Sequence, residues 1–134
     1  YFYNVYGNKQ ISKGKMATVI GIFEDQYSKK LPLTVVKPGT QTRKFTHISD
    51  TIKVCLYAWK KNKCKHYSIY SKQNYSILQI AKIFGGKIKY LDSRPGERYS
   101  SRVEKKYLSN NIILKESKIG IKKYIMDYKK KFNS

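Results

Sequence analysis

The apolar positions of this chain change period several times, and each change predicts a new element. The opening YFYNVYG alternates aromatic and β-branched residues and ends in Gly, which predicts a short strand. Apolar residues recur at a helical period over 16–30, and Pro32 follows, so we expect a helix there. Segments 33–36 and 43–46 predict two strand-like arms around a Lys37-Pro38-Gly39 turn, together forming a small platform.

The second half of the chain continues the alternation of helix and strand. Ser49 or Asp50 is expected to cap a helix that runs to the basic KKNKCK stretch. Segment 66–70 predicts a strand, 76–84 a helix that ends at Gly85-Gly86, and 87–91 another strand. The tail, 117–131, predicts an amphipathic helix. These alternating elements favour an α/β fold in a single segment, 1–134, without repeats or an internal boundary.

A net charge of +21 is typical of proteins that bind a phosphate-bearing partner. However, the charge comes from 25 Lys and only 4 Arg, and the lysines are scattered along the chain. Lys, Ile, Asn and Tyr make up nearly half of all residues. This pattern indicates compositional bias at tolerant surface positions, so the charge alone does not identify a nucleic-acid partner.

Several classes of protein are disfavoured by what the sequence contains. No apolar run approaches the roughly 18 residues of a membrane helix, and the first residues do not resemble a signal peptide. Cys55 and Cys64 form no CxxC pair, and the chain has only two histidines, so we expect neither a metal site nor a disulfide framework. We therefore expect a cytoplasmic protein that does not associate with membranes.

The scarce arginines mark places where a planar, bidentate guanidinium is needed rather than a point charge. The chain's four arginines are Arg43, Arg94, Arg98 and Arg102. Arg43 follows one Pro-Gly turn and Arg94 opens another, so two loops each present a guanidinium that can clamp a diphosphate. The alternative is that each arginine pairs with a nearby carboxylate such as Asp50, Asp92 or Glu97, and the composition leaves both interpretations open.

Four motifs in this order resemble the extended short-chain dehydrogenase family of nucleotide-sugar epimerases and dehydratases, the UDP-glucose 4-epimerase type. YFYNVYGNKQ is similar to the family segment Arg-Tyr-Phe-Asn-Val-Tyr-Gly-Pro-Arg-Gln. LPLTVVKPGTQTRKFTHISD is similar to the segment that runs from a Pro-Leu-Thr-Ile strand through a Gly-Asp-Gly turn to Gln-Thr-Arg-Asp-Phe-Val-His-Val-Asp-Asp. HYSIYSKQNYSILQIA and SRPGERYSS match the family's Tyr-Asn-Ile-Gly-Ser segment and its Arg-Pro-Gly-Glu loop. The resemblance covers nearly the whole chain.

The resemblance implies roles for residues around the diphosphate and the cofactor. Asn4 matches the asparagine that touches the diphosphate region of the sugar nucleotide. Tyr3 matches the family position that lies behind the nicotinamide ring of the cofactor. Arg43 and Arg94 match the two arginines that grip the diphosphate. The resemblance and the scarcity of arginine therefore lead to the same two guanidinium groups.

The resemblance also implies contacts to the nucleobase and the sugar. Leu33, Thr34 and Val35 match the strand whose backbone edge holds the nucleobase, and Thr18 matches a more variable contact at a helix start. Glu97 and Ser101 lie in the loop that closes over the substrate.

The chain also departs from the family pattern around the predicted clamp. Lys37 and Pro38 replace the usual Gly-Asp of the turn, Asn8 replaces a Pro, and Lys44 replaces an Asp beside Arg43. Lys44 has two interpretations, a second cation that strengthens phosphate binding or a sign that the site has drifted.

The family's chemistry needs a Gly-rich turn for the dinucleotide and a Tyr-x-x-x-Lys pair, and neither is found here in the matching place. Tyr57 and Lys61 have the spacing, but a chain with 13 Tyr and 25 Lys is expected to contain about two such pairs by chance. This pair also follows the THISD motif, whereas the family's catalytic pair precedes the segment that YFYNVYG matches. We therefore expect the C-terminal substrate-binding lobe plus the last elements of a Rossmann-type sheet. The dinucleotide-binding part would be absent, with NAD bound mainly by that absent part, and the segment alone would be inactive.

The resemblance implies an enzyme that binds a nucleoside-diphosphate sugar, first of all a UDP-sugar, and epimerises it at C4. Dehydration or decarboxylation on the same scaffold stays open, and a homodimer is implied for the full-length enzyme. Sheet-facing apolar surfaces would be exposed in the isolated segment, which predicts association. The alternative from another class is a non-catalytic basic module that holds single-stranded nucleic acid through interleaved Tyr and Lys side chains.

Overall fold

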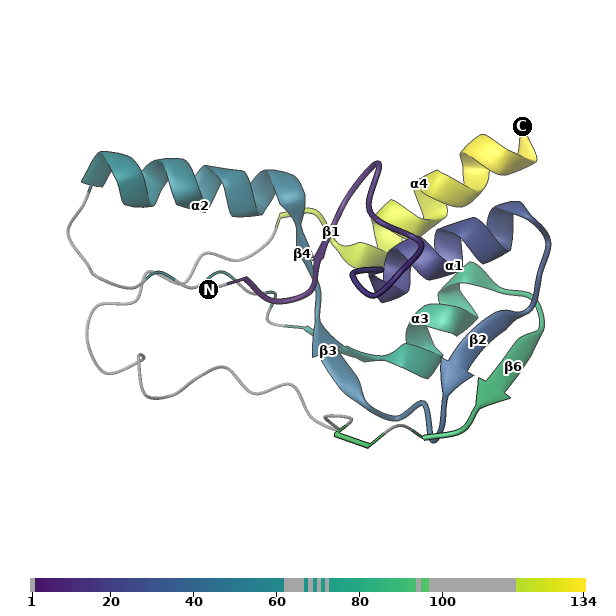
Figure 1. Ribbon diagram of the computed structural model, residues 1–134. Helices are drawn as coiled ribbons and strands as arrows, with labels where there is room; N and C mark the ends of the chain where they lie inside the picture. The colour runs from purple at the N-terminus through teal and green to yellow at the C-terminus, as the bar shows by residue number, and fades with distance from the viewer. Residues whose placement is uncertain are drawn as a thin grey trace.

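The computed structural model of the protein describes residues 2–61, 67, 69, 71, 73–93, 95–96 and 118–134. Three helices gather around one core: α1 (Val19–Ser28), α3 (Ile77–Phe84) and α4 (Ile121–Asn133). A fourth helix, α2 (Ile48–Lys61), projects away from these three (Figure 1). Strands and helices alternate along the chain, which confirms the α/β class that the sequence predicted.

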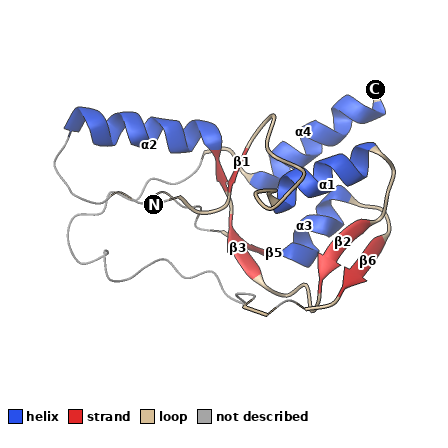
Figure 2. Cartoon of the chain, viewed as in Figure 1, coloured by secondary structure: helices blue, strands red, loops and turns tan. Residues whose placement is uncertain are grey.

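The strands form three separate pairs (Figure 2). The parallel pairs are β1 (Val5–Tyr6) with β4 (Thr46–His47) and β2 (Leu33–Val36) with β6 (Ile88–Leu91), and the antiparallel pair is β3 (Thr42–Lys44) with β5 (Asn74–Ser76). The two arms around the Lys37-Pro38 turn are therefore β2 and β3, as predicted, but they lie in different sheets. The expected platform is wrong because β6 takes the edge of β2 and β5 takes the edge of β3.

Side-chain caps set the starts of two helices. The Thr18 side chain accepts a hydrogen bond from Gly21 N, so α1 begins at Val19 and runs to Ser28, shorter at both ends than the expected 16–30. Gly21 is required there because a Cβ at this position would lie 2.5 Å from the Ile11 carbonyl oxygen. Ser76 and Gln79 form a reciprocal capping box at the start of α3, and Gly85, with φ of 83°, ends it.

The predicted cap of α2 is wrong. The helix begins at Ile48, which places Asp50 inside the first turn instead of before it. The Asp50 side chain is buried, and its Oδ2 accepts a hydrogen bond from Ile119 N at 3.4 Å. Its carboxylate therefore ties the segment that precedes α4 to the positive end of the α2 dipole.

Two other predicted elements overlap the described residues only in part. Of the strand expected at 66–70, Tyr67 and Ile69 are described, and Ile69 makes an isolated parallel bridge with Phe2. The tail helix is confirmed, although α4 begins at Ile121, after Gly120, later than the expected residue 117.

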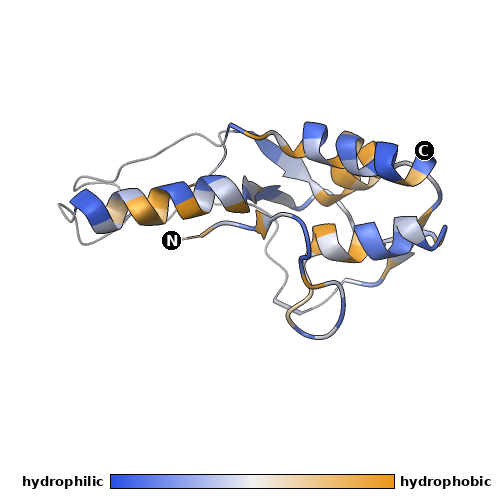
Figure 3. Cartoon of the chain, turned by 90° about the horizontal axis from the view of Figure 1, so that it is seen from above, coloured by the Kyte–Doolittle hydropathy of each residue, from blue (hydrophilic) through white to orange (hydrophobic). Residues whose placement is uncertain are grey.

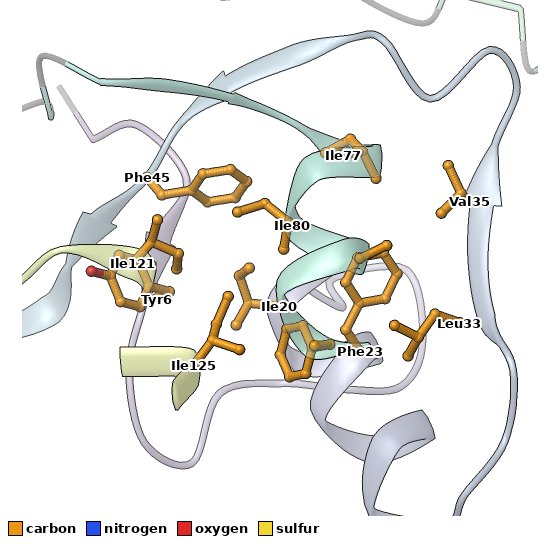
Figure 4. Close-up of a cluster of buried hydrophobic side chains, with 12 residues drawn as sticks. Tyr6, Ile20, Phe23, Leu33, Val35, Phe45, Ile77, Ile80, Ile121 and Ile125 are labelled. Carbon is orange, nitrogen blue, oxygen red and sulfur yellow. The ribbon is translucent and has the colours of Figure 1, made fainter. Parts of the chain in front are cut away.

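The core lies between α1, α3, α4 and the inner face of β2 (Figure 4). Its buried side chains are Tyr6, Ile20, Phe23, Leu33, Val35, Phe45, Ile77, Ile80, Ala81, Phe84, Ile121 and Ile125. Phe23 and Phe84 meet edge to face, with ring centroids 5.8 Å apart. These contacts join segments from both ends of the chain.

Helix α2 carries an apolar stripe that the described part of the chain does not cover (Figure 3). Ile52 is 51% exposed, Leu56 50% and Trp59 77%. These residues and Ile48 follow a helical period, so they lie along one face of the helix. No helix in the described residues is both long and apolar enough to cross a membrane.

Candidate functional site

A cavity of about 420 Å³ opens between the N-terminal end of α1 and strands β2 and β3. Its lining residues are Asn4, Val5, Ala17, Thr18, Val19, Ile20, Ile22, Phe23, Thr34, Val36, Gln41, Arg43, Phe45, Ile77 and Leu91. Ile20, Phe23 and Phe45 belong both to this lining and to the hydrophobic core, where Figure 4 labels them. The rim carries polar groups, which is the usual composition of a small-molecule site.

Four of the predicted site residues line this cavity, and each comes from a different segment. Asn4 precedes β1, Thr18 caps α1, Thr34 lies in β2 and Arg43 lies in β3. Segments up to 39 positions apart in the sequence are thus brought to one place by the fold. Tyr3 is described and half-buried but does not line the cavity.

Strand β2 presents alternate residues to the core and to the cavity. Leu33 and Val35 are buried in the core, whereas Thr34 and Val36 line the cavity. The backbone groups of β2 alternate in the same way. Leu33 N donates to the Lys87 carbonyl oxygen and Lys37 N to the Leu91 carbonyl oxygen, so the main-chain groups of Thr34 and Val36 lie on the edge of β2 away from β6. One of these groups, Thr34 N, donates to Gln26 Oε1 at 3.0 Å.

Strand β3 separates Arg43 from its cationic neighbour. Arg43 lines the cavity, and its Nη1 donates to the Thr42 carbonyl oxygen at 2.8 Å. Lys44 points to the other face, where its Nζ lies 3.4 Å from the Ser71 carbonyl oxygen and burial lowers the pKa of its ammonium group. Lys44 is therefore not among the residues that line this cavity.

Asn4 is held in a left-handed backbone conformation, with φ of 43°. Its Nδ2 donates to the Lys44 carbonyl oxygen at 3.1 Å, and its own carbonyl oxygen accepts from Thr46 N. Asparagine tolerates this region of φ better than most residues. The first bond holds the Asn4 side chain against the end of β3, and the second holds its backbone against the start of β4.

Gln41 lines the cavity but was not among the predicted site residues. It is 1% exposed, and its Nε2 donates to the Val36 carbonyl oxygen at 3.1 Å. Its Oε1 has no hydrogen-bond partner in the described part of the chain. The sequence did contain a signal: in an extended segment Gln41, Arg43 and Phe45 fall on one face, and all three line the cavity.

Three predicted site residues, Arg94, Glu97 and Ser101, lie outside the described residues. Within the described ranges, no three His, Cys, Asp or Glu side chains come together in a way that would hold a metal ion. The described polar rim thus consists of amide, hydroxyl and guanidinium groups, which suit an anionic organic ligand.

The model of the NAD-dependent epimerase/dehydratase family matches residues 1–71, more than half of the chain. The chain belongs to this family. The matched residues include Asn4, Thr18, Thr34 and Arg43, which line the cavity. No curated protein matches the chain in sequence.

Solved structures of nucleotide-sugar epimerases have the same fold as this family member. A UDP-glucose 4-epimerase from Thermotoga maritima, solved with UDP-glucose, has a TM-score of 0.73 at 19% identity over 98% of this chain. A UDP-glucuronic acid 4-epimerase from Bacillus cereus, solved with UDP-glucuronic acid and NAD, has a TM-score of 0.71 at 26% identity over 96%. A UDP-N-acetylglucosamine 4-epimerase from Methanobrevibacter ruminantium, solved with UDP-N-acetylmuramic acid, has a TM-score of 0.76 at 19% identity over 98%.

The chain spans less than half the length of these epimerases, between 43% and 45%. The likeness confirms the predicted fold, that of an extended short-chain dehydrogenase.

Proposed function

We propose that this chain is the substrate-binding part of an NAD-dependent nucleotide-sugar epimerase and that its cavity holds the nucleoside diphosphate of a UDP-sugar. One observation carries the proposal: Asn4, Thr18, Thr34 and Arg43, four residues assigned to the ligand through the resemblance, line the same cavity. Their shared location supports the proposal.

In this proposal each group of residues has a separate task. The guanidinium of Arg43 pairs with the diphosphate, and a bidentate fork suits this ligand better than an ammonium group. Asn4 Nδ2 donates one hydrogen to Lys44 O, and its second hydrogen is directed to the same anion. Thr34 N and Val36 O are bonded to Gln26 and Gln41, so the Thr34 carbonyl oxygen and the Val36 N–H take the nucleobase, and Gln41 Oε1 accepts a ligand donor. Arg94, Glu97 and Ser101 complete the closing side.

NAD would supply reversible hydride transfer at the sugar carbon. Through the resemblance, Tyr3 is the residue of this chain that we assign to the cofactor. The role of these residues is to bind and orient the sugar nucleotide, which lowers the barrier through positioning. We propose epimerisation at C4 by a homodimeric enzyme. Proton NMR is then expected to show conversion of UDP-glucose into UDP-galactose by the full-length protein. A 4-keto dehydration product or loss of CO₂ from a uronic acid would indicate another branch instead.

Substitution of Arg43 tests the binding site. Arg43→Ala is expected to weaken UDP-glucose binding about 10-fold to 100-fold, the range of a charged hydrogen-bonded contact, in isothermal titration calorimetry. Arg43→Lys is expected to recover only part of the loss because it keeps the charge but not the fork.

The control for the +21 charge is Lys82→Ala, an exposed residue of α3 that does not line the cavity. It removes the same charge and is expected to leave the affinity unchanged. Equal losses in the Arg43 and Lys82 variants would mean that the ligand senses only the overall field, and the proposal would be wrong.

A further inference from the structure

A chain of hydrogen bonds leads from the C-terminal helix to the rim of the cavity. In α4, Tyr124 Oη donates to Glu24 Oε1 at 2.7 Å. Gln10 Nε2 donates to Glu24 Oε2 at 3.0 Å, and Thr18 Oγ1 donates to Gln10 Oε1 at 2.9 Å. None of the family motifs assigned a role to Glu24 or Gln10.

The chemistry of Glu24 sets the direction of every bond in this chain. An ionised carboxylate only accepts hydrogen bonds, so the Gln10 amide must turn its NH₂ group towards Glu24. The carbonyl oxygen of Gln10 then faces Thr18. If the amide were reversed, two acceptors would face each other at 3.0 Å, which is unfavourable.

The orientation of Gln10 decides what the Thr18 hydroxyl offers to the cavity. A hydroxyl has one hydrogen and two lone pairs, and Thr18 donates its hydrogen to Gln10. One lone pair accepts from Gly21 N at 3.0 Å. A single lone pair remains on a residue that lines the cavity, so Thr18 can accept a hydrogen bond there but cannot donate one.

We propose that Glu24 and Gln10 are positioning residues that lock Thr18 as a hydrogen-bond acceptor for a hydroxyl group of the bound sugar nucleotide. This inference rests on the proposed function and specifies which group of the ligand Thr18 binds. Thr18 cannot serve a phosphate oxygen, which is itself an acceptor. It selects a ligand hydroxyl, of the pyranose or of the ribose.

The first test compares UDP-glucose and UDP as ligands in isothermal titration calorimetry. Thr18→Val is expected to weaken UDP-glucose binding about threefold to tenfold, the range of one neutral hydrogen bond, whereas Thr18→Ser keeps the hydroxyl and the affinity. A loss confined to UDP-glucose assigns the hydroxyl to the pyranose, and an equal loss for UDP assigns it to the ribose. Unchanged affinity of Thr18→Val for both ligands would overturn the proposal.

The second test asks whether Glu24 acts through Thr18. Glu24→Leu is expected to cause a similar loss because the Gln10 amide is then free to reverse. Glu24→Gln is expected to bind like the wild type, since its oxygen accepts from Gln10 while its NH₂ donates to Tyr124 Oη. Gln10→Leu removes the same connection from the other side, which provides a second variant if Glu24→Leu does not fold.

The decisive measurement is the double variant. If Glu24 only stabilises the fold, Glu24→Leu lowers the affinity equally in the presence and absence of the Thr18 hydroxyl. Our inference requires that Glu24→Leu has no further effect on affinity in the Thr18→Val background, and an additive loss would overturn it. Failure of the wild-type chain to bind either ligand would instead overturn the proposed function, and this inference with it.

Discussion

His47 joins β4 to the aromatic side chains around the first strand. Its ring lies 5.2 Å from that of Tyr6 and 5.8 Å from that of Tyr124, and its Nδ1 accepts from Ser49 N at 3.2 Å. Burial lowers the pKa of His47, and the charge of Asp50 opposes this effect. The folded protein therefore binds a proton at His47 less tightly than the unfolded chain does.

This difference makes stability depend on pH. Since the unfolded chain binds the proton more tightly, the free energy of unfolding is expected to fall as pH drops below about 6.5, the ordinary pKa of histidine. Urea unfolding at pH 7.5 and pH 5.5 would show the decrease, and His47→Gln is expected to reduce it. A decrease of the same size in the variant would show that other groups cause it.

The sequence predicted those site residues that the family resemblance identifies one by one. Asn4, Thr18, Thr34 and Arg43 were found through the resemblance, and all four line the cavity. Gln41 was missed because its burial and its unpaired oxygen depend on how β2 and β3 are placed. The role of Glu24 was equally hidden, since its partners Gln10 and Tyr124 are remote in sequence.

At the scale of elements, helices were easier to predict than strands because their signals are local. The capping box of α3 and its terminal Gly85 could be read directly from the sequence. The start of α2 was misplaced because Asp50, a good capping residue, is used in a tertiary contact with Ile119. Strand positions were also predicted, but strand partners depend on the packing of the whole chain.

The capping box of α3 provides a direct test of element stability. Ser76 Oγ accepts from Gln79 N at 3.0 Å, and Gln79 Oε1 accepts from Ser76 N at 2.8 Å. Ser76→Ala is expected to lower the free energy of unfolding by about 1 kcal/mol, measured by urea denaturation. Ser76→Asp keeps an acceptor at the cap and is expected to lose much less. If both variants lost the same amount, the cap would not be the cause.

At the scale of the whole molecule, the apolar stripe of α2 is expected to drive association of the isolated chain. Its exposed side chains lie on one helix face, and scattered single residues would not have this effect. The charge of +21 opposes association, so the apparent mass in sedimentation velocity is expected to rise with salt concentration.

Charged residues on the stripe are expected to abolish this association. Ile52→Glu with Leu56→Glu should give a monomer, whereas Met126→Glu, at a 47% exposed position in α4, should not. A wild-type chain that stays monomeric at all salt concentrations would contradict the expectation. If the α2 and α4 variants changed the apparent mass equally, the cause would be the change in net charge and not the loss of the apolar stripe.

The pairing of the strands also has a consequence for the speed of folding. Val5 pairs with Thr46, Leu33 with Ile88 and Arg43 with Tyr75, so each ladder joins segments that are far apart in the sequence. A long stretch of chain must lose its freedom before the first bond of any ladder forms. The helices can form locally within microseconds, but the cavity between α1 and strands β2 and β3 forms only after these remote pairings. Its assembly is therefore expected on the millisecond to second scale of non-local topologies.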